Sequence, residues 1–101
     1  MPLNPKAEEL KQGTKRFALA VIKFVRAFPS TRDGRILGDQ VLGSATSVAA
    51  NNRAACRGRS KAEFIAKLGL VVEEAGESHL WLELISESGA ASQITARSSG
   101  Q

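Results

Sequence analysis

The sequence predicts an all-α protein, an antiparallel up-down helical bundle. Three long segments carry apolar side chains at alternating spacings of three and four residues, the period of an amphipathic helix. Residues that favour helix ends separate these segments. We expect helices over about residues 5–28, 33–56 and 61–88, all within one helical bundle domain of residues 1–89. Residues 90–101 are small and polar apart from Ile94 and are expected to form a flexible C-terminal tail.

The first expected helix begins at Asn4-Pro5, with asparagine as the N-cap and proline at the first helical position, where a missing N–H costs nothing. Pro29 ends this helix, because the residue before a proline is pushed out of the α region. The apolar stripe between these points consists of Leu10, Thr14, Phe17, Val21, Phe24 and Phe28.

The second expected helix is capped by Ser30 or Thr31 and ends near Gly58, a suitable C-cap residue. Its middle, residues 43–47 (GSATS), has no bulky side chain. Such residues allow a neighbouring helix to approach closely. The segment lacks the spaced glycines and the lysine of a phosphate-binding loop, so we interpret it as a packing surface.

The third expected helix is the most apolar and organises the others. Ser60 and Glu63 form a capping box, in which the hydroxyl accepts from the Glu63 amide and the carboxylate accepts from the Ser60 amide. Gly89 is placed for a left-handed C-cap. The apolar face is wide enough to require more than one neighbour, and we expect Phe64 and Trp81 to be buried. The residues expected in core or oligomer contacts are Phe64, Leu68, Val72, Trp81 and Leu84.

Charge is unevenly distributed along the chain. Residues 1–62 carry twelve lysines and arginines against four carboxylates, whereas residues 63–101 carry two against six. The basic part either pairs with the acidic third helix or forms a surface that attracts phosphate. In the second case, the candidate nucleic-acid-binding residues are Arg53, Arg57, Arg59, Lys61, Lys11, Lys15, Lys23 and Arg26.

The sequence offers little for catalysis, and we expect neither an enzyme nor a cofactor. The chain has one histidine, His79, and one cysteine, Cys56, too few for a structural zinc site. A nucleophile pair of these two residues would lack an orienting third group. No apolar run approaches the roughly 18 residues that span a bilayer, and no signal peptide is recognisable, so a cytoplasmic location is expected.

Several short stretches together resemble a known family. They are Thr46-Ser47-Val48-x-Ala50-Asn51, Ser60-Lys61-x-x-Phe64-Ile65-x-Lys67 and Glu74-Ala75-x-Glu77-Ser78-x-x-Trp81-Leu82. The pattern, from about residue 17 to residue 89, resembles the bacterial four-helix-bundle proteins encoded in intervening sequences of 23S rRNA genes. The resemblance implies an up-down bundle, often a homopentamer, with no established enzymatic activity. A related branch is the accessory protein of diversity-generating retroelements, a basic pentamer that works with a reverse transcriptase and nucleic acid.

The chain also departs from this pattern. Gly43, Ala54 and Gly76 stand where the family usually has Arg, Glu and Arg, and Asn52 stands where it prefers an aliphatic residue. The family's fourth helix, after Gly89, is expected to be missing or truncated, which would leave grooves of the first and third helices partly uncovered.

Two functions remain open at this point. The first is a non-enzymatic, self-associating protein of the 23S rRNA intervening-sequence type, a homo-oligomer for which the resemblance favours a pentamer. The alternative is a basic nucleic-acid-binding accessory module that acts with a polymerase or with ribosomal RNA.

Overall fold

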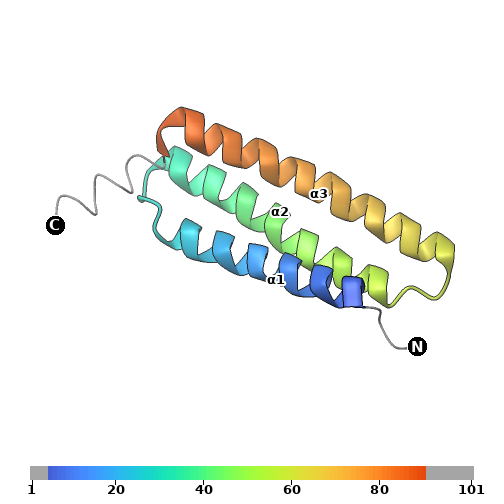
Figure 1. Cartoon of the computed structure of the whole chain (residues 1–101). Coiled ribbons are helices and arrows are strands. Elements are labelled where there is room, and N and C mark those ends of the chain that lie inside the picture. The colour runs from blue at the N-terminus through green and yellow to red at the C-terminus, as the bar shows by residue number, and fades with distance from the viewer. Residues whose placement is uncertain (1–4, 91–101) are drawn as a thin grey trace.

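The structure is a computed structural model that describes residues 5–90. Within this range it contains three helices and no strand: α1 (Pro5–Arg26), α2 (Arg32–Cys56) and α3 (Lys61–Ser88). The expected all-α class is therefore confirmed. The helices lie side by side with α2 in the middle, and the chain reverses direction after each of the first two (Figure 1). Packing is between α1 and α2 and between α2 and α3, so α2 is the shared support.

The connection from α1 to α2 is tight. The Ala27 amide donates to the Phe24 carbonyl (3.1 Å) and the Phe28 amide to the Val25 carbonyl (3.0 Å), so α1 ends at Arg26, two residues before the expected end. Thr31 caps α2, and its hydroxyl accepts from the Gly34 amide at 3.2 Å. As a result α2 begins at residue 32, one residue earlier than expected. The proposed N-cap of α1, Asn4, lies outside the described residues.

Close approach between α1 and α2 depends on Gly38. A Cβ atom at this position would lie 3.2 Å from Cγ1 of Val25 and 3.4 Å from Cδ2 of Phe28. A larger residue would therefore push α1 and its following loop away. The sequence analysis placed close packing at residues 43–47 and missed this contact. Gly43 is in fact exposed, with open space around it.

Contact between α2 and α3 is made through small residues, as expected for the middle of α2. The hydroxyls of Ser44 and Ser78 lie 2.8 Å apart in a buried hydrogen bond. Each hydroxyl also reaches a carbonyl of its own helix, Val41 for Ser44 (3.3 Å) and Glu74 for Ser78 (3.0 Å). Both polar groups are thus satisfied without a bulky side chain, which lets the two backbones lie close together.

The hydrophobic core lies at one end of the molecule, where the loop between α1 and α2 meets the end of α3. Its buried members are Val21, Val41, Ala45, Ile85 and Ala90. Gly89 has a φ of +86°, which confirms the left-handed C-cap. Ala90 was expected in the flexible tail, but it is buried because this turn directs it into the core. The rest of the expected tail lies outside the described residues.

The connection from α2 to α3 differs from expectation in two details. Ser60 accepts from the Glu63 amide (3.1 Å), as a capping box requires, but the Glu63 carboxylate accepts from the Arg59 amide (3.1 Å) and not from Ser60. Arg57, not Gly58, is the C-cap of α2. Gly58 is needed for space instead, because a Cβ there would lie 3.2 Å from the Ala55 carbonyl oxygen.

The expected burial of Phe64 is wrong for the single chain. Its side chain is 44% exposed, whereas Trp81 is half-buried against the core. The physical reason is that α3 packs mainly on α2, and away from the core end its side nearest α1 is covered by no helix among the described residues. Of the other residues expected in core or oligomer contacts, Leu68 is half-buried and Val72 and Leu84 are exposed.

Replacing Ile85 tests the position of the core. Ile85→Ala should lower the free energy of unfolding by about 2–5 kcal/mol, because the side chain is fully buried and leaves a cavity. Ile36→Ala is the matched control: this side chain is about half exposed and should cost less than about 1 kcal/mol. Urea unfolding measures both. Equal losses in the two variants would contradict the assigned core.

Candidate interaction surfaces

Four basic residues form a cluster, the basic turn, at the connection between α2 and α3. Arg53 lies in the last turn of α2, Arg57 and Arg59 in the loop, and Lys61 at the start of α3. All four are exposed. The nearby Glu63 carboxylate accepts a hydrogen bond from the backbone amide of Arg59. The structure therefore brings these four candidate residues together at the end of the molecule that lies away from the core.

The four basic candidates on α1 do not form a single group. Lys6 and Leu10 line a recess together with Asn52 and Cys56, so the first turns of α1 lie beside the last turns of α2. Lys11, which is half-buried, is therefore in the half of α1 that lies toward the basic turn, and Lys15 is at the middle of α1. The exposed Lys23 and Arg26 lie in the last turn of α1, at the opposite end.

Pairing between the basic N-terminal part and the acidic third helix is not seen in the described part of the chain. α1 and α3 flank α2 on different sides (Figure 1). The ion pair that the structure records within residues 5–90 joins His79 Nδ1 and Glu83 Oε1 at 3.4 Å, one turn apart on α3. In residues 5–90 the basic residues thus remain without carboxylate partners.

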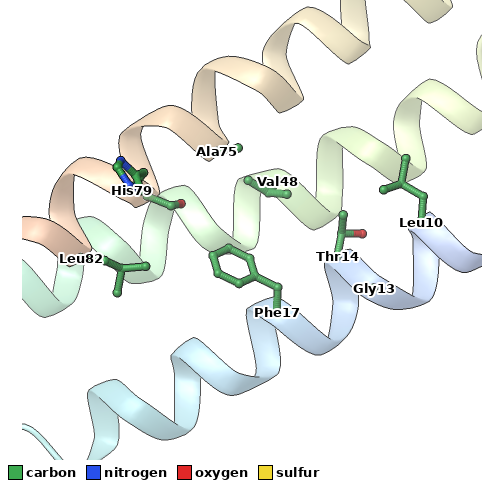
Figure 2. Close-up of a pocket in the computed structure, with 9 residues that line it drawn as sticks. Leu10, Gly13, Thr14, Phe17, Val48, Ala75, His79 and Leu82 are labelled. Carbon is green, nitrogen blue, oxygen red and sulfur yellow. The ribbon is translucent and has the colours of Figure 1, made fainter.

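An apolar groove runs between α1 and α3, with α2 as its floor. Its larger recess, of about 340 Å³, lies between Leu10 and Phe17 of α1, Val48 of α2 and Leu82 of α3 (Figure 2). A second recess, of about 230 Å³, lies between Leu10, Asn52, Cys56, Phe64 and Leu68. Because Leu10 belongs to both, the recesses are two parts of one groove.

Asn52 is the exceptional residue of the groove floor. The residue is 1% exposed, and among the described residues its Nδ2 atom has no hydrogen-bond partner. A buried, unpaired amide of this kind costs roughly 1–3 kcal/mol. The sequence analysis noted Asn52 only as a departure from an aliphatic preference. The sequence does contain a signal for this buried amide, because Asn52 is a polar residue within the apolar stripe of α2.

Residues 5–90 contain no group of three or more histidine, cysteine, aspartate or glutamate side chains that could hold a metal ion. Cys56 and His79, the formal nucleophile pair, line different recesses of the groove. In the same part of the chain, no helix combines the length and the apolar character needed to cross a membrane.

The outer side of α3 carries further exposed apolar side chains. Val72 is 71% exposed and Ile65 is 56% exposed, and Leu70, Leu80 and Leu84 are also exposed. A helix that is apolar on all sides is normally covered on more than one of them. In the single chain, however, α3 packs mainly on α2.

These features define an all-α protein that presents an open apolar groove, an apolar outer helix face and a basic turn. The chain belongs to the 23S rRNA-intervening sequence protein family, whose model matches residues 6–99. The expectation from the sequence motifs is confirmed, and the match extends beyond residues 17–89 at both ends.

A solved structure supports the same assignment. The chain is similar to the crystal structure of a protein of unknown function from the S23 ribosomal protein family of Bacteroides thetaiotaomicron. The TM-score is 0.77 and the sequence identity is 28%, with 94% of this chain and 89% of that chain covered. No curated protein matches the chain.

Replacing Asn52 tests whether its amide is unpaired. Asn52→Leu should raise the free energy of unfolding by about 1 kcal/mol or more, because it removes a buried donor without a partner. Asn51→Leu is the control and should lower it, since the Asn51 side chain donates to the Ser47 carbonyl at 3.0 Å. Urea unfolding at one protein concentration compares the two. A loss of more than about 1 kcal/mol for Asn52→Leu would show that the amide has a partner.

Proposed function

We propose that the protein is a non-enzymatic, self-associating helical protein that acts through contacts with other macromolecules. The observation that carries this proposal is the uncovered apolar surface on two sides of α3. One is the side that lines the groove, and the other is the outer face. Of the nine large apolar residues that are exposed in residues 5–90, six belong to α3. Contiguous apolar surface of this kind marks interaction sites in soluble proteins.

The groove is the natural place for a further helix. It is walled by α1 and α3 and floored by α2, so one helix seated in it would complete a four-helix up-down bundle of the kind that the family resemblance implies. Such a helix would cover Leu10 and Phe64, which are exposed in the single chain.

Assembly follows from the same surfaces. We expect a homo-oligomer, and the resemblance favours a closed ring of five subunits. In a closed ring every subunit would present its own basic turn, so the turns would repeat around the assembly.

Charging the groove tests this proposal. Sedimentation equilibrium at micromolar concentration should show an oligomer for the wild type and a lower mass for Leu10→Glu, because Leu10 contributes to both recesses. Leu19→Glu introduces the same charge on α1 at a similarly exposed leucine that lines neither recess, and it should leave the mass unchanged. A monomeric wild type would remove the proposal.

Binding of nucleic acid is the second candidate function, and the basic turn favours it. Arg53, Arg57, Arg59 and Lys61 are exposed at one end of the molecule without a carboxylate partner in residues 5–90. Contacts from such a cluster would be made to phosphates, which position a protein on nucleic acid without reading its sequence. A ring of subunits would present the cluster several times and so strengthen binding.

The test is the triple variant Arg53→Ala, Arg57→Ala and Arg59→Ala, measured against RNA and DNA over a salt series. Affinity should fall at least about tenfold at low salt, and the slope of log affinity against log salt should decrease, because fewer phosphates are neutralised. The control removes the same charge from exposed positions that are not binding candidates: Arg16→Ala, Arg32→Ala and Arg35→Ala. Equal effects of the two triple variants, or no binding by the wild type at low salt, would exclude this function for the basic turn.

A further inference from the structure

The outer face of α3 carries a regular surface that meets the groove only at one end, at His79. We call it the α3 seam, and it consists of Ala62, Ile65, Gly69, Val72, Gly76 and His79. Successive members are three and four residues apart, the spacing that places side chains along one line on a helix and allows two helices to interlock. All six residues are exposed.

The two glycines of the α3 seam have no role within the single chain. A Cβ atom at Gly69 or Gly76 would meet nothing within 4 Å, and neither glycine has a positive φ. Glycine weakens a helix, so an open, helical position would ordinarily favour another residue. The two positions are seven residues apart on the same side of α3. They leave space at which the backbone of another helix can approach closely.

The remaining apolar members of the α3 seam are large and unusually exposed. Val72 and Ile65 have the highest exposed fractions among the exposed large apolar residues in residues 5–90. The seam therefore alternates between small residues that leave space and large residues that project. Interlocking helices use this alternation, because a large side chain of one helix fills the space above a small residue of the other.

The seam is complementary to itself when two copies run in opposite directions. We propose that the occupant of the α3 seam is the α3 seam of a second copy, in an antiparallel pair around a two-fold axis near residues 70 and 71. In this register Gly69 faces Val72 of the partner subunit, and Gly76 faces Ile65 of the partner subunit. Ala62 faces His79 of the partner subunit. A two-fold axis repeats each contact, so every small residue of one seam faces a large residue of the other.

Charge favours the same direction. Lys61 and Glu83 are exposed on the same side of α3 as the seam. Lys61 lies at the start of the seam and Glu83 lies just beyond its end. Antiparallel pairing brings Lys61 within about one helical turn of the level of Glu83 of the partner subunit. Parallel pairing would place the two lysines together and the two glutamates together, and it would also place glycine opposite glycine. The antiparallel pair is therefore preferred by both shape and charge.

The expected dimer is weak. At about 1.5 Å per residue, the seam from Ala62 to His79 is roughly 26 Å long. A contact of one helix with one helix over this length is smaller than a standard protein–protein interface, which buries about 800 Å² per partner. We expect a dimer that dissociates in the micromolar range, through a surface that shares only His79 with the lining of the groove. This inference rests on the proposed self-association and assigns one of its surfaces.

Filling the space above one glycine tests the seam. Gly76→Gln should weaken dimerisation at least about tenfold in sedimentation velocity, because the new side chain occupies the place of Ile65 of the partner subunit. Gly43→Gln is the matched control, since Gly43 is also helical, exposed and without a neighbour within 4 Å. Glutamine is a better helix former than glycine, so circular dichroism should show that both variants remain folded.

Disulfide cross-linking tests the direction. In a Cys56→Ser background, the double variant Ala62→Cys and His79→Cys should form a covalent dimer on oxidation, because the two positions face each other across the antiparallel pair. His79→Cys alone should not, since its two copies would be far beyond the roughly 7 Å between Cα atoms that a disulfide tolerates. Cross-linking of the single variant as fast as the double variant would overturn the antiparallel arrangement.

The outcomes separate this inference from the proposed function. A wild-type protein that stays monomeric at concentrations well above the micromolar range would remove both. A wild-type oligomer whose mass is unaffected by Gly76→Gln would remove the α3 seam alone and leave the groove as the surface of assembly. Loss of dimers in Gly76→Gln with no change in Gly43→Gln would support the seam.

Discussion

The fold depends on the close approach of α2 to both of its neighbours. Gly38 admits Val25 and Phe28 on the side of α1, and the buried hydrogen bond between Ser44 and Ser78 holds α3 at short range. Because α1 and α3 pack mainly on α2 and approach each other in the core at one end, the rest of the space between them stays open as an apolar groove. The groove as a candidate interaction surface is thus a direct consequence of how the central helix is packed.

Local signals in the sequence located the helices well. The caps at Thr31, Ser60 and Gly89 depend on residue types within a few positions of each other, and the structure shows all three. The family followed from motifs that lie along the helices. Gly58 was misjudged because its glycine is required by the approach of Phe64 and the Ala55 carbonyl, a spatial constraint that leaves no local pattern.

The candidate sites were less predictable, because they depend on which helix faces cover one another. The basic turn could be anticipated, since a short loop brings Arg53 and Lys61 together in any packing. Burial of Phe64 could not be judged correctly, because an apolar stripe shows that a face needs a cover and not whether the same chain supplies it. The unpaired amide of Asn52 likewise emerged only when its surroundings were known.

The position of the hydrophobic core at one end makes the molecule mechanically uneven. Val21, Val41 and Ile85 pack the three helices together where the first loop meets the end of α3. At the other end of the molecule the buried residues are Ala55 and Asn52, which belong to α2 and are not part of this core. Local opening follows the density of buried contacts, so backbone amides near the basic turn exchange with solvent sooner than those near the core. The end that carries the arginines is therefore the end that is expected to open first, while the opposite end keeps the helices in register.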